Sequence, residues 1–270
     1  MLRISIFFGA IECISGYVTA PSATETALTV CAGNSLTIRA AKEGSKIHIL
    51  QAWGKTKGAG IVKILSPRMH DNVQNLRLNR IAAKNAVLLP AGFKQLVYPQ
   101  DTLRVLMTGS ATAADIETFG MLIHYEELEG AEGRFATWDE IQSRIKNWIS
   151  VPVSITTAAT GEYSGQVAIN STYDLMKANT DYALIGWNSS GVGGTVRYQG
   201  IDTGNLGVGG PATTEQEVDT KNWFKNLSDR WNIPCIPILN SANKAGILID
   251  VTQDEDAAAV VIYSILAELD

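Results

Sequence analysis

The chain has 270 residues, enough for one large domain or two domains of ordinary size. With 46% hydrophobic and 18% charged residues, it has the composition of a globular protein and not of a disordered or membrane-embedded one. Its 22 basic and 27 acidic residues give a net charge of −5, which argues against a general nucleic-acid-binding role.

The N-terminus begins Met1-Leu2-Arg3 and continues with an apolar run from Ile4 to Ile11. This resembles a short secretion signal, but only one basic residue precedes the run, and Glu12 ends it after eight residues. We therefore predict a retained first strand, with a contact to a membrane or another surface as an option. A cleaved signal peptide is the alternative.

Two tryptophan-centred stretches look like two copies of one hairpin. The first is Ile47–Trp53, a glycine-rich turn and Ile61–Leu65; the second is Tyr182–Trp187, a similar turn and Thr195–Tyr198. At a constant spacing of 134 residues, four positions match. The matched positions are Trp53 with Trp187, Gly60 with Gly194, Val62 with Val196, and Lys63 with Arg197. This repeat predicts a duplicated β domain with equivalent core tryptophans.

Short apolar runs before the first hairpin predict further strands at Ile11–Val18, Ala27–Cys31 and Leu36–Arg39. Between Pro67 and Pro99 the pattern changes and predicts a short helix or a structured excursion. This stretch carries five basic residues against the single acid Asp71: Arg68, Arg77, Arg80, Lys84 and Lys94. A solvated basic face is the plainer interpretation. A surface facing anionic lipid or nucleic acid within an assembly is the sharper one.

Strands at Leu103–Met107 and Thr118–Tyr125 close the first half, and the Glu- and Gly-rich segment Glu126–Arg134 is the best linker. A capping box then predicts a helix starting at Thr137, since the Thr137 hydroxyl and the Glu140 carboxylate can satisfy free N–H groups of its first turn. Its apolar stripe is Trp138, Ile141, Ile145, Trp148 and Ile149, and Pro152 is expected to stop it.

In the second half we predict a strand at Val167–Ile169, a flexible loop at Gly204–Gly210 and an amphipathic helix at Thr214–Trp231. Strands are predicted at Ile236–Leu239, Gly246–Val251 and Ala257–Leu266. A gapless match of the closing strands places Leu106-Met107 opposite Ile247-Leu248, Asp115 opposite Asp256, and Glu127-Leu128 opposite Glu268-Leu269.

No catalytic motif is found: the histidines His48, His70 and His124 have no metal-ligand spacing, and Walker, HExxH and GxSxG patterns are absent from the sequence. We therefore predict that the protein is not an enzyme and needs no cofactor. One acidic cluster is a candidate calcium site, because calcium prefers several carboxylate oxygens. It comprises Asp250, Asp254, Glu255 and Asp256.

The three cysteines, Cys13, Cys31 and Cys235, form neither a disulfide framework nor a CxxC site. We predict buried reduced thiols, and leave open whether Cys13 and Cys31 pair.

The predicted fold class is all-β with a few helices. It consists of two tandem eight-stranded antiparallel jelly rolls, each with a helical insertion before its last strands. The expected domains are residues 1–128, a linker and helix at 129–150, and a second jelly roll at 151–270.

This repeat resembles the double jelly-roll major capsid proteins of tailless icosahedral viruses, in particular the corticovirus type that encloses an internal membrane. The resemblance covers residues 10 to 269, but it is architectural and carries no diagnostic motif. It implies a homotrimeric, pseudo-hexameric capsomer in a bacteriophage capsid, assembled in the host cytoplasm. Its partners would be neighbouring capsomers and minor or vertex proteins, with a membrane contact through the N-terminus or residues 68–94, and no sequence-specific nucleic acid.

Two other functions stay open. A tandem β-sandwich carbohydrate-binding protein would expose Trp or Tyr on a sheet face or loop. A jelly-roll enzyme is disfavoured for cupin chemistry because no histidine cluster is present, while a glycosidase carboxylate pair is not visible from spacing alone.

Overall fold

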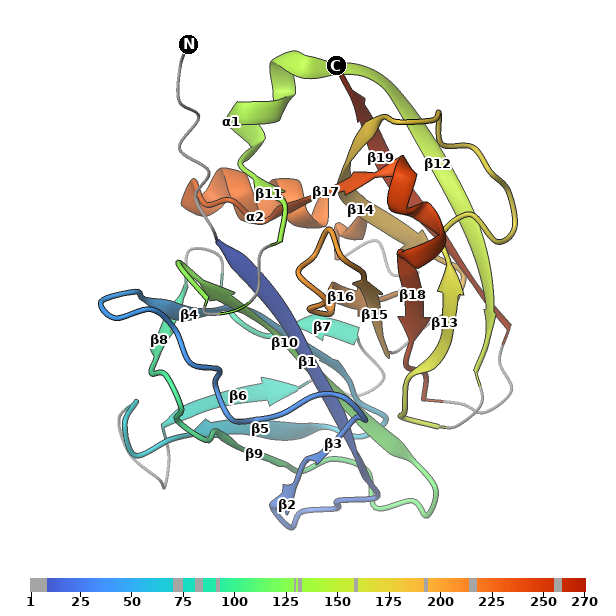
Figure 1. Ribbon diagram of the computed structural model, residues 1–270. Helices are drawn as coiled ribbons and strands as arrows, with labels where there is room; N and C mark the ends of the chain where they lie inside the picture. The colour runs from blue at the N-terminus through green and yellow to red at the C-terminus, as the bar shows by residue number, and fades with distance from the viewer. Residues whose placement is uncertain are drawn as a thin grey trace.

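A computed structural model gives the architecture of the chain (Figure 1). The structure describes residues 9–69, 75–80, 85–90, 93–128, 130, 133–157, 160–191, 194–213, 218–254 and 259–270. The predicted contacts of the N-terminal segment 1–8 therefore lie outside the described residues, as do His70, Asp71, Lys84, Glu255 and Asp256.

The described chain is mostly β-structure in four antiparallel sheets, with few helices. In the first part the strands are β1 Ala10–Thr19, β2 Thr26–Ala27, β3 Thr29–Val30, β4 Ile47–Lys55, β5 Gly60–Leu65, β6 Leu76–Arg80, β7 Asn85–Val87, β8 Gln95–Val97, β9 Arg104–Met107 and β10 Ile116–Tyr125. In the second part they are β11 Phe135–Ala136, β12 Ile145–Thr156, β13 Ser164–Ala168, β14 Asp181–Ser189, β15 Gly194–Gln199, β16 Val208–Ala212, β17 Ile236–Asn240, β18 Leu248–Val251 and β19 Ala259–Leu269. The all-β class is confirmed.

Strands β1 to β10 form a first sandwich. One sheet has the order β3-β1-β10-β4, with β7 and β8 both pairing with β4, and the other has the order β2-β9-β5-β6. Alternate residues of the two sheets meet in one core, for example Ile14 and Met121 with Val62 and Val105.

Strands β12 to β19 form a second sandwich with the same order. One sheet runs β12-β19-β14-β17, with β11 added beyond β17, and the other runs β13-β18-β15-β16. In both sandwiches the first strand pairs with the last, and the last pairs with the first strand of the tryptophan hairpin. The two halves therefore share one topology.

The predicted hairpin repeat is confirmed. Strands β14 and β15 lie 134 residues after β4 and β5, with identical lengths. The gapless match of the closing strands was wrong by three residues, because Met107 pairs with Val62 while Val251, not Leu248, pairs with Val196. Extra residues in the excursions of the second half account for the difference.

The two hairpin tryptophans point to opposite faces of their sheets. In β4 the unpaired bulge residue is Leu50, whereas in β14 it is Ile185, one position later in the repeat. Because side chains alternate along a strand, a bulge displaced by one residue reverses every side chain after it. Trp187 lies inside the second sandwich and Trp53 lies outside the first. The prediction of equivalent core tryptophans was therefore wrong, although both side chains are buried.

The capping box at Thr137 and Glu140 is confirmed, but the helix it starts is short. Helix α1 covers Trp138–Ile141 and one 3-10 turn follows at Gln142–Arg144, after which Ile145 begins strand β12. The predicted helical stripe through Ile149 was wrong, since every second residue from Val151 to Ile155 is buried, the period of a strand. Pro152 fits because β12 is an edge strand.

Helix α2 covers Trp223–Trp231, preceded by the 3-10 turn Thr220–Asn222, so it starts nine residues later than predicted. The predicted flexible loop at Gly204–Gly210 was also wrong at its end, because Val208–Ala212 is the buried strand β16. Gly209 serves close packing here, since a Cβ on it would lie 1.9 Å from the Val196 carbonyl oxygen.

The expected helical insertion is present in the second half as α2, between β16 and β17. In the first half, the described residues of the 67–99 excursion form strands β6, β7 and β8 and no helix. The run Leu36–Arg39 contributes only a bridge between Thr37 and Thr102.

Candidate functional site

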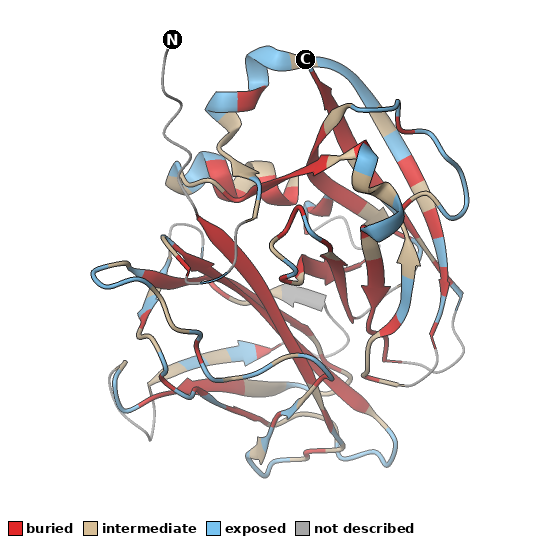
Figure 2. Cartoon of the chain, in the orientation of Figure 1, coloured by how far each residue is buried: buried red, intermediate tan, exposed pale blue. Residues whose placement is uncertain are grey.

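The two sandwiches pack face to face, and this junction is the largest organised site in the described chain. The outer side of β1, β10 and β4 lies against β15 and β16 of the second sandwich. We call this surface the docking face; its residues are Ile11, Cys13, Ser15, Trp53, Gly120 and Leu122, all buried. Figure 2 shows β1 and β10 buried along nearly their whole length, as expected for a sheet covered on both faces.

Three indoles join the sandwiches. Trp53 donates from Nε1 to the Thr195 hydroxyl at 3.0 Å, and its ring meets Trp223 edge-on at 5.6 Å between centroids. Trp223 in turn lies 6.3 Å from Trp187. Gly120 provides the space, since a Cβ there would lie 2.4 Å from the Trp53 ring. Packing of this kind adds to the stabilisation from apolar burial.

The other part of the junction is polar and fully paired. Arg197 binds Asp250 through two hydrogen bonds of 2.6 and 2.9 Å, and its guanidinium lies 3.7 Å from the centre of the Tyr163 ring. Ser15 of the first sandwich donates to the Tyr163 hydroxyl at 2.7 Å. Buried charges need such partners, so this network fixes how the sandwiches meet. A basic residue at the centre of an apolar strand, repeated as Lys63 and Arg197, was the one sequence signal for it.

The predicted buried cysteines are found at the same junction. Cys13, Cys31 and Cys235 are all free and buried. Burial raises the pKa of Cys31 to about 11 and raises that of Cys13 further. These thiols are therefore protonated and unreactive at neutral pH.

The candidate calcium residues divide between two ion pairs. Asp250 binds Arg197, while Asp254 receives Lys55 at 2.9 Å and Lys57 at 2.8 Å from the first sandwich. Among the described residues, no group of three acidic, histidine or cysteine side chains is arranged to hold a metal. Since Glu255 and Asp256 lie outside the described residues, the calcium site remains a prediction.

Two histidines form a cross-strand pair at one end of the docking face. His48 on β4 lies opposite His124 on β10, and both are buried. The space next to Gly9 places His124 Nε2 beside Pro234 of the second sandwich, and this nitrogen lacks a hydrogen-bond partner among the described residues. Burial, then His48 and Lys94, lower the pKa of His124 to about 4. Burial followed by Lys94 also lowers the pKa of His48.

We expect acid to destabilise the fold through His124. Its pKa is lower in the folded state than its ordinary value of 6.5, so its contribution is complete above pH 6.5 and is lost as pH falls toward 4. The loss by pH 4.5 should be about 2–3 kcal/mol. Urea unfolding at pH 7.5 and 4.5 measures it, with His124→Leu as the matched variant that removes this contribution to the pH dependence. Equal acid sensitivity in the two proteins would contradict the assignment.

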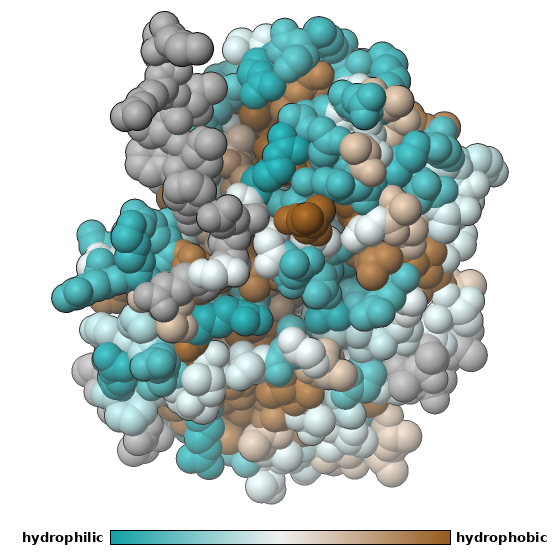
Figure 3. Space-filling model, viewed as in Figure 1, coloured by the Kyte–Doolittle hydropathy of each residue, from teal (hydrophilic) through white to brown (hydrophobic). Residues whose placement is uncertain are grey.

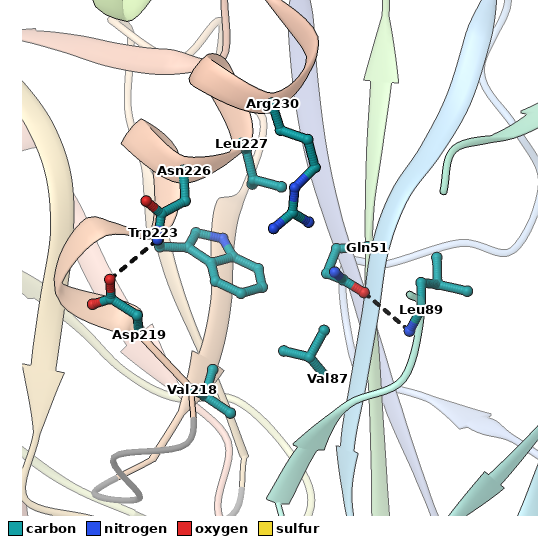
Figure 4. A pocket seen from close by; sticks show the side chains of 9 residues that line it. All are labelled: Gln51, Val87, Leu89, Val218, Asp219, Trp223, Asn226, Leu227 and Arg230. Atoms are coloured by element: carbon teal, nitrogen blue, oxygen red, sulfur yellow. Dashed lines mark hydrogen bonds between the residues drawn. The ribbon is translucent and has the colours of Figure 1, made fainter. Parts of the chain in front are cut away.

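A cavity of about 270 Å³ opens between α2 and the first sandwich (Figure 4). Gln51 and Leu89 line one wall, and Trp223, Leu227 and Arg230 line the other. Gln51 Oε1 accepts from the Leu89 N–H, which occupies the main acceptor in that wall. The cavity holds no cluster of catalytic groups and is small for a ligand site.

The equivalent of the docking face in the second sandwich is uncovered. Pro152 pairs with Tyr263 as Ser15 pairs with Gly120, and Asn188 occupies the position of Trp53. We call this surface the open face; its residues are Trp148, Ser150, Pro152, Asn188, Tyr263 and Ile265, all at least partly exposed. Trp148 is 49% exposed and Tyr263 40%, which is unusual for large apolar side chains.

The basic stretch does not form one surface in its described part. Arg80 is buried in an ion pair with Glu117, and Arg68 stacks on Tyr98 and binds the Pro99 carbonyl. Arg77 and Lys94 are exposed, on β6 and near the histidine pair respectively. The prediction of a lipid or nucleic-acid contact stays a prediction.

The surface seen from the side of Figure 1 is mainly hydrophilic, with hydrophobic side chains in separate patches (Figure 3). None of the helices in the described ranges has the length and apolar character needed to cross a membrane.

No protein-family model matches the sequence, and no curated protein matches it. Among solved structures, the chain is similar to the PBSX exported protein XepA, with 7% identity, 99% of this chain and 89% of that chain covered, and a TM-score of 0.22. It is similar to the Macrobrachium rosenbergii nodavirus structure, with 11% identity, 100% and 92% covered, and a TM-score of 0.19. A third similarity is to the STIV MCP, with 9% identity, 96% of both chains covered, and a TM-score of 0.17.

Proposed function

We propose that this protein is a viral major capsid protein in which two jelly rolls stand in tandem. The strand orders β1-β10-β4-β8 with β2-β9-β5-β6, and β12-β19-β14-β17 with β13-β18-β15-β16, support the jelly-roll assignment. Each pairs the first strand with the last and separates consecutive strands between two sheets, as a jelly roll does.

The observation that carries the proposal is the way in which the two sandwiches are stacked. The outer side of the first sheet of one sandwich rests on the outer side of the second sheet of the other. Such a contact joins unlike surfaces, so it leaves an equivalent surface free at each end of the chain. A unit of this kind adds further copies of itself and closes into a ring or continues into an array.

Three chains would supply six similar sandwiches, a number suited to near-hexagonal tiling of a shell by one gene product. In this proposal the protein is a virion component of a bacteriophage, a homotrimer in the capsid, assembled in the host cytoplasm. Its partners are neighbouring capsomers and vertex proteins, with an internal membrane beneath. A structural role of this kind requires no catalytic site, metal or cofactor.

Self-association tests the proposal. We expect light scattering coupled to size-exclusion chromatography to show a mass near three times 29.1 kDa, or larger assemblies, rising with protein concentration. A monomer at every concentration up to the millimolar range would contradict a shell-forming role.

A carbohydrate-binding protein is the second candidate, because the open face exposes Trp148 and Tyr263 on a sheet surface. Aromatic rings of this kind can stack on sugars. Binding on a glycan array that is lost in Trp148→Ala would favour this function, and an array without hits would count against it.

A further inference from the structure

We propose that the open face of one copy docks onto the outer side of β5, β6 and β9 in the first sandwich of a second copy. This inference rests on the proposed self-assembly and names the two surfaces that carry it. Within one chain, the docking face rests on β15 and β16, the counterparts of β5 and β6 in the second sandwich. Repeating that contact between chains places the open face on β5 and β6.

The register identifies the residues that would be contacted. In the second sandwich, Thr195 and Arg197 face the docking face and pair with Pro211 and Gly209 of β16. The corresponding residues of the first sandwich are Ile61 and Lys63 on β5, paired with Asn79 and Arg77 on β6. The next strand adds Arg104, on the same side as Lys63 and Leu106. Arg77, Asn79 and Arg104 are exposed.

The sizes of the side chains are complementary in both contacts. Inside the chain, the large docking-face residue Trp53 meets a surface kept low by Gly207 and Gly209, where the Cys13 N–H reaches the Gly207 carbonyl oxygen at 2.7 Å. Between chains the order is reversed. The open face has Asn188 in place of Trp53 and Ser150 in place of Cys13, whereas the opposing strand has Arg77 in place of Gly209.

The chemistry of the two surfaces is also complementary. The open face carries the exposed rings of Trp148 and Tyr263 and no charged side chain among its six residues. The opposing surface presents the guanidinium groups of Arg77 and Arg104. Guanidinium groups stack well on aromatic rings, and aromatic and arginine side chains carry much of the binding energy of protein interfaces. Lys63, which already pairs with Glu25, is not needed for the contact.

Two full-length variants test this assignment. The first, Trp148→Arg with Tyr263→Arg, makes the open face repel the arginines of a second copy. The second, Ile61→Arg with Asn79→Arg, adds bulk and charge to the opposing surface and leaves the open face intact. Tyr173→Arg is the control, because Tyr173 is 59% exposed but lies on neither surface. Thermal unfolding of each protein verifies that it is folded.

The expected result is specific to a contact between unlike surfaces. Each double variant alone should lose self-association by roughly 30-fold or more, while Tyr173→Arg should behave as the unmodified protein. A one-to-one mixture of the two double variants should form a dimer and stop there, because one intact pair of surfaces remains. Analytical ultracentrifugation of the three samples measures these masses.

Three outcomes would overturn the assignment. A dimer of the Ile61→Arg, Asn79→Arg variant alone would mean that the open face pairs with itself. Self-association unchanged in both double variants would mean that the chain assembles through other surfaces, which leaves the proposed function intact. A monomeric unmodified protein would remove the proposed function together with this inference.

Discussion

Replacing Trp53 with alanine should lower the free energy of unfolding by about 3–5 kcal/mol, the usual cost of truncating a large buried side chain. Trp53 is 1% exposed and crosses from the first sandwich to the second. Its loss removes the hydrogen bond to Thr195, the edge contact with Trp223 and the packing over Gly120. The cavity would open in the junction itself.

Comparison with Trp187→Ala gives this prediction its specificity. Trp187 is equally buried, and its Nε1 donates to the Pro211 carbonyl within the second sandwich. Both variants should lose a similar amount of stability, but Trp53→Ala should also uncouple the two sandwiches and broaden or split the transition. Guanidinium unfolding followed by circular dichroism measures both effects, with Tyr173→Ala as the exposed control. A loss below about 1 kcal/mol for Trp53→Ala would contradict the junction described above.

A second large effect is expected at Glu117. This carboxylate is fully buried and lies 3.3 Å from the Arg80 guanidinium. It also accepts backbone N–H groups of Lys57, Gly58 and Ser110 at 2.8–3.3 Å. Glu117 therefore joins the turn after β4 to the turn before β10. We expect Glu117→Gln to cost about 3–5 kcal/mol, because it leaves the buried Arg80 cation without its counter-charge.

A double variant separates charge from hydrogen bonding at this site. In Glu117→Gln with Arg80→Met, the Gln carbonyl can still accept the backbone N–H groups and no unpaired cation remains. The double variant should therefore be more stable than Glu117→Gln alone. Urea unfolding of the two single variants and the double variant gives the coupling energy. If the double variant loses the sum of the two single losses, Arg80 and Glu117 do not interact.

The repeated hairpin was visible in the sequence because its spacing of 134 residues is uninterrupted, and the structure places two strand pairs at that spacing. The direction of the tryptophans was not visible. It depends on whether Leu50 or Ile185 is left unpaired, and a bulge is selected by packing across the sheet and not by the strand's own composition.

The region after Thr137 shows the opposite limit. The capping box predicts a helix start correctly, but the apolar residues Ile145 and Ile149 fit a helical spacing and a strand spacing equally well. Pairing of β12 with β19 along its whole length decides for the strand. Such long-range pairing leaves no local signal.

The junction was not predictable as a site for the same reason. Arg197 and Asp250 are 53 residues apart, and Ser15 and Tyr163 are 148 apart. The sequence marked Asp250 as a metal ligand because acidic residues cluster near it, whereas the fold gives it an arginine. Only the matched basic pair, Lys63 and Arg197, indicated that these strands carry a charge that needs a partner.

Electron microscopy of the purified protein tests the shell-forming role most directly. Negative-stain images should show particles with six similar lobes arranged around a central axis, three chains each contributing two, and larger curved or closed assemblies at higher concentration. A homogeneous population of two-lobed single chains, unchanged by concentration, would contradict the account.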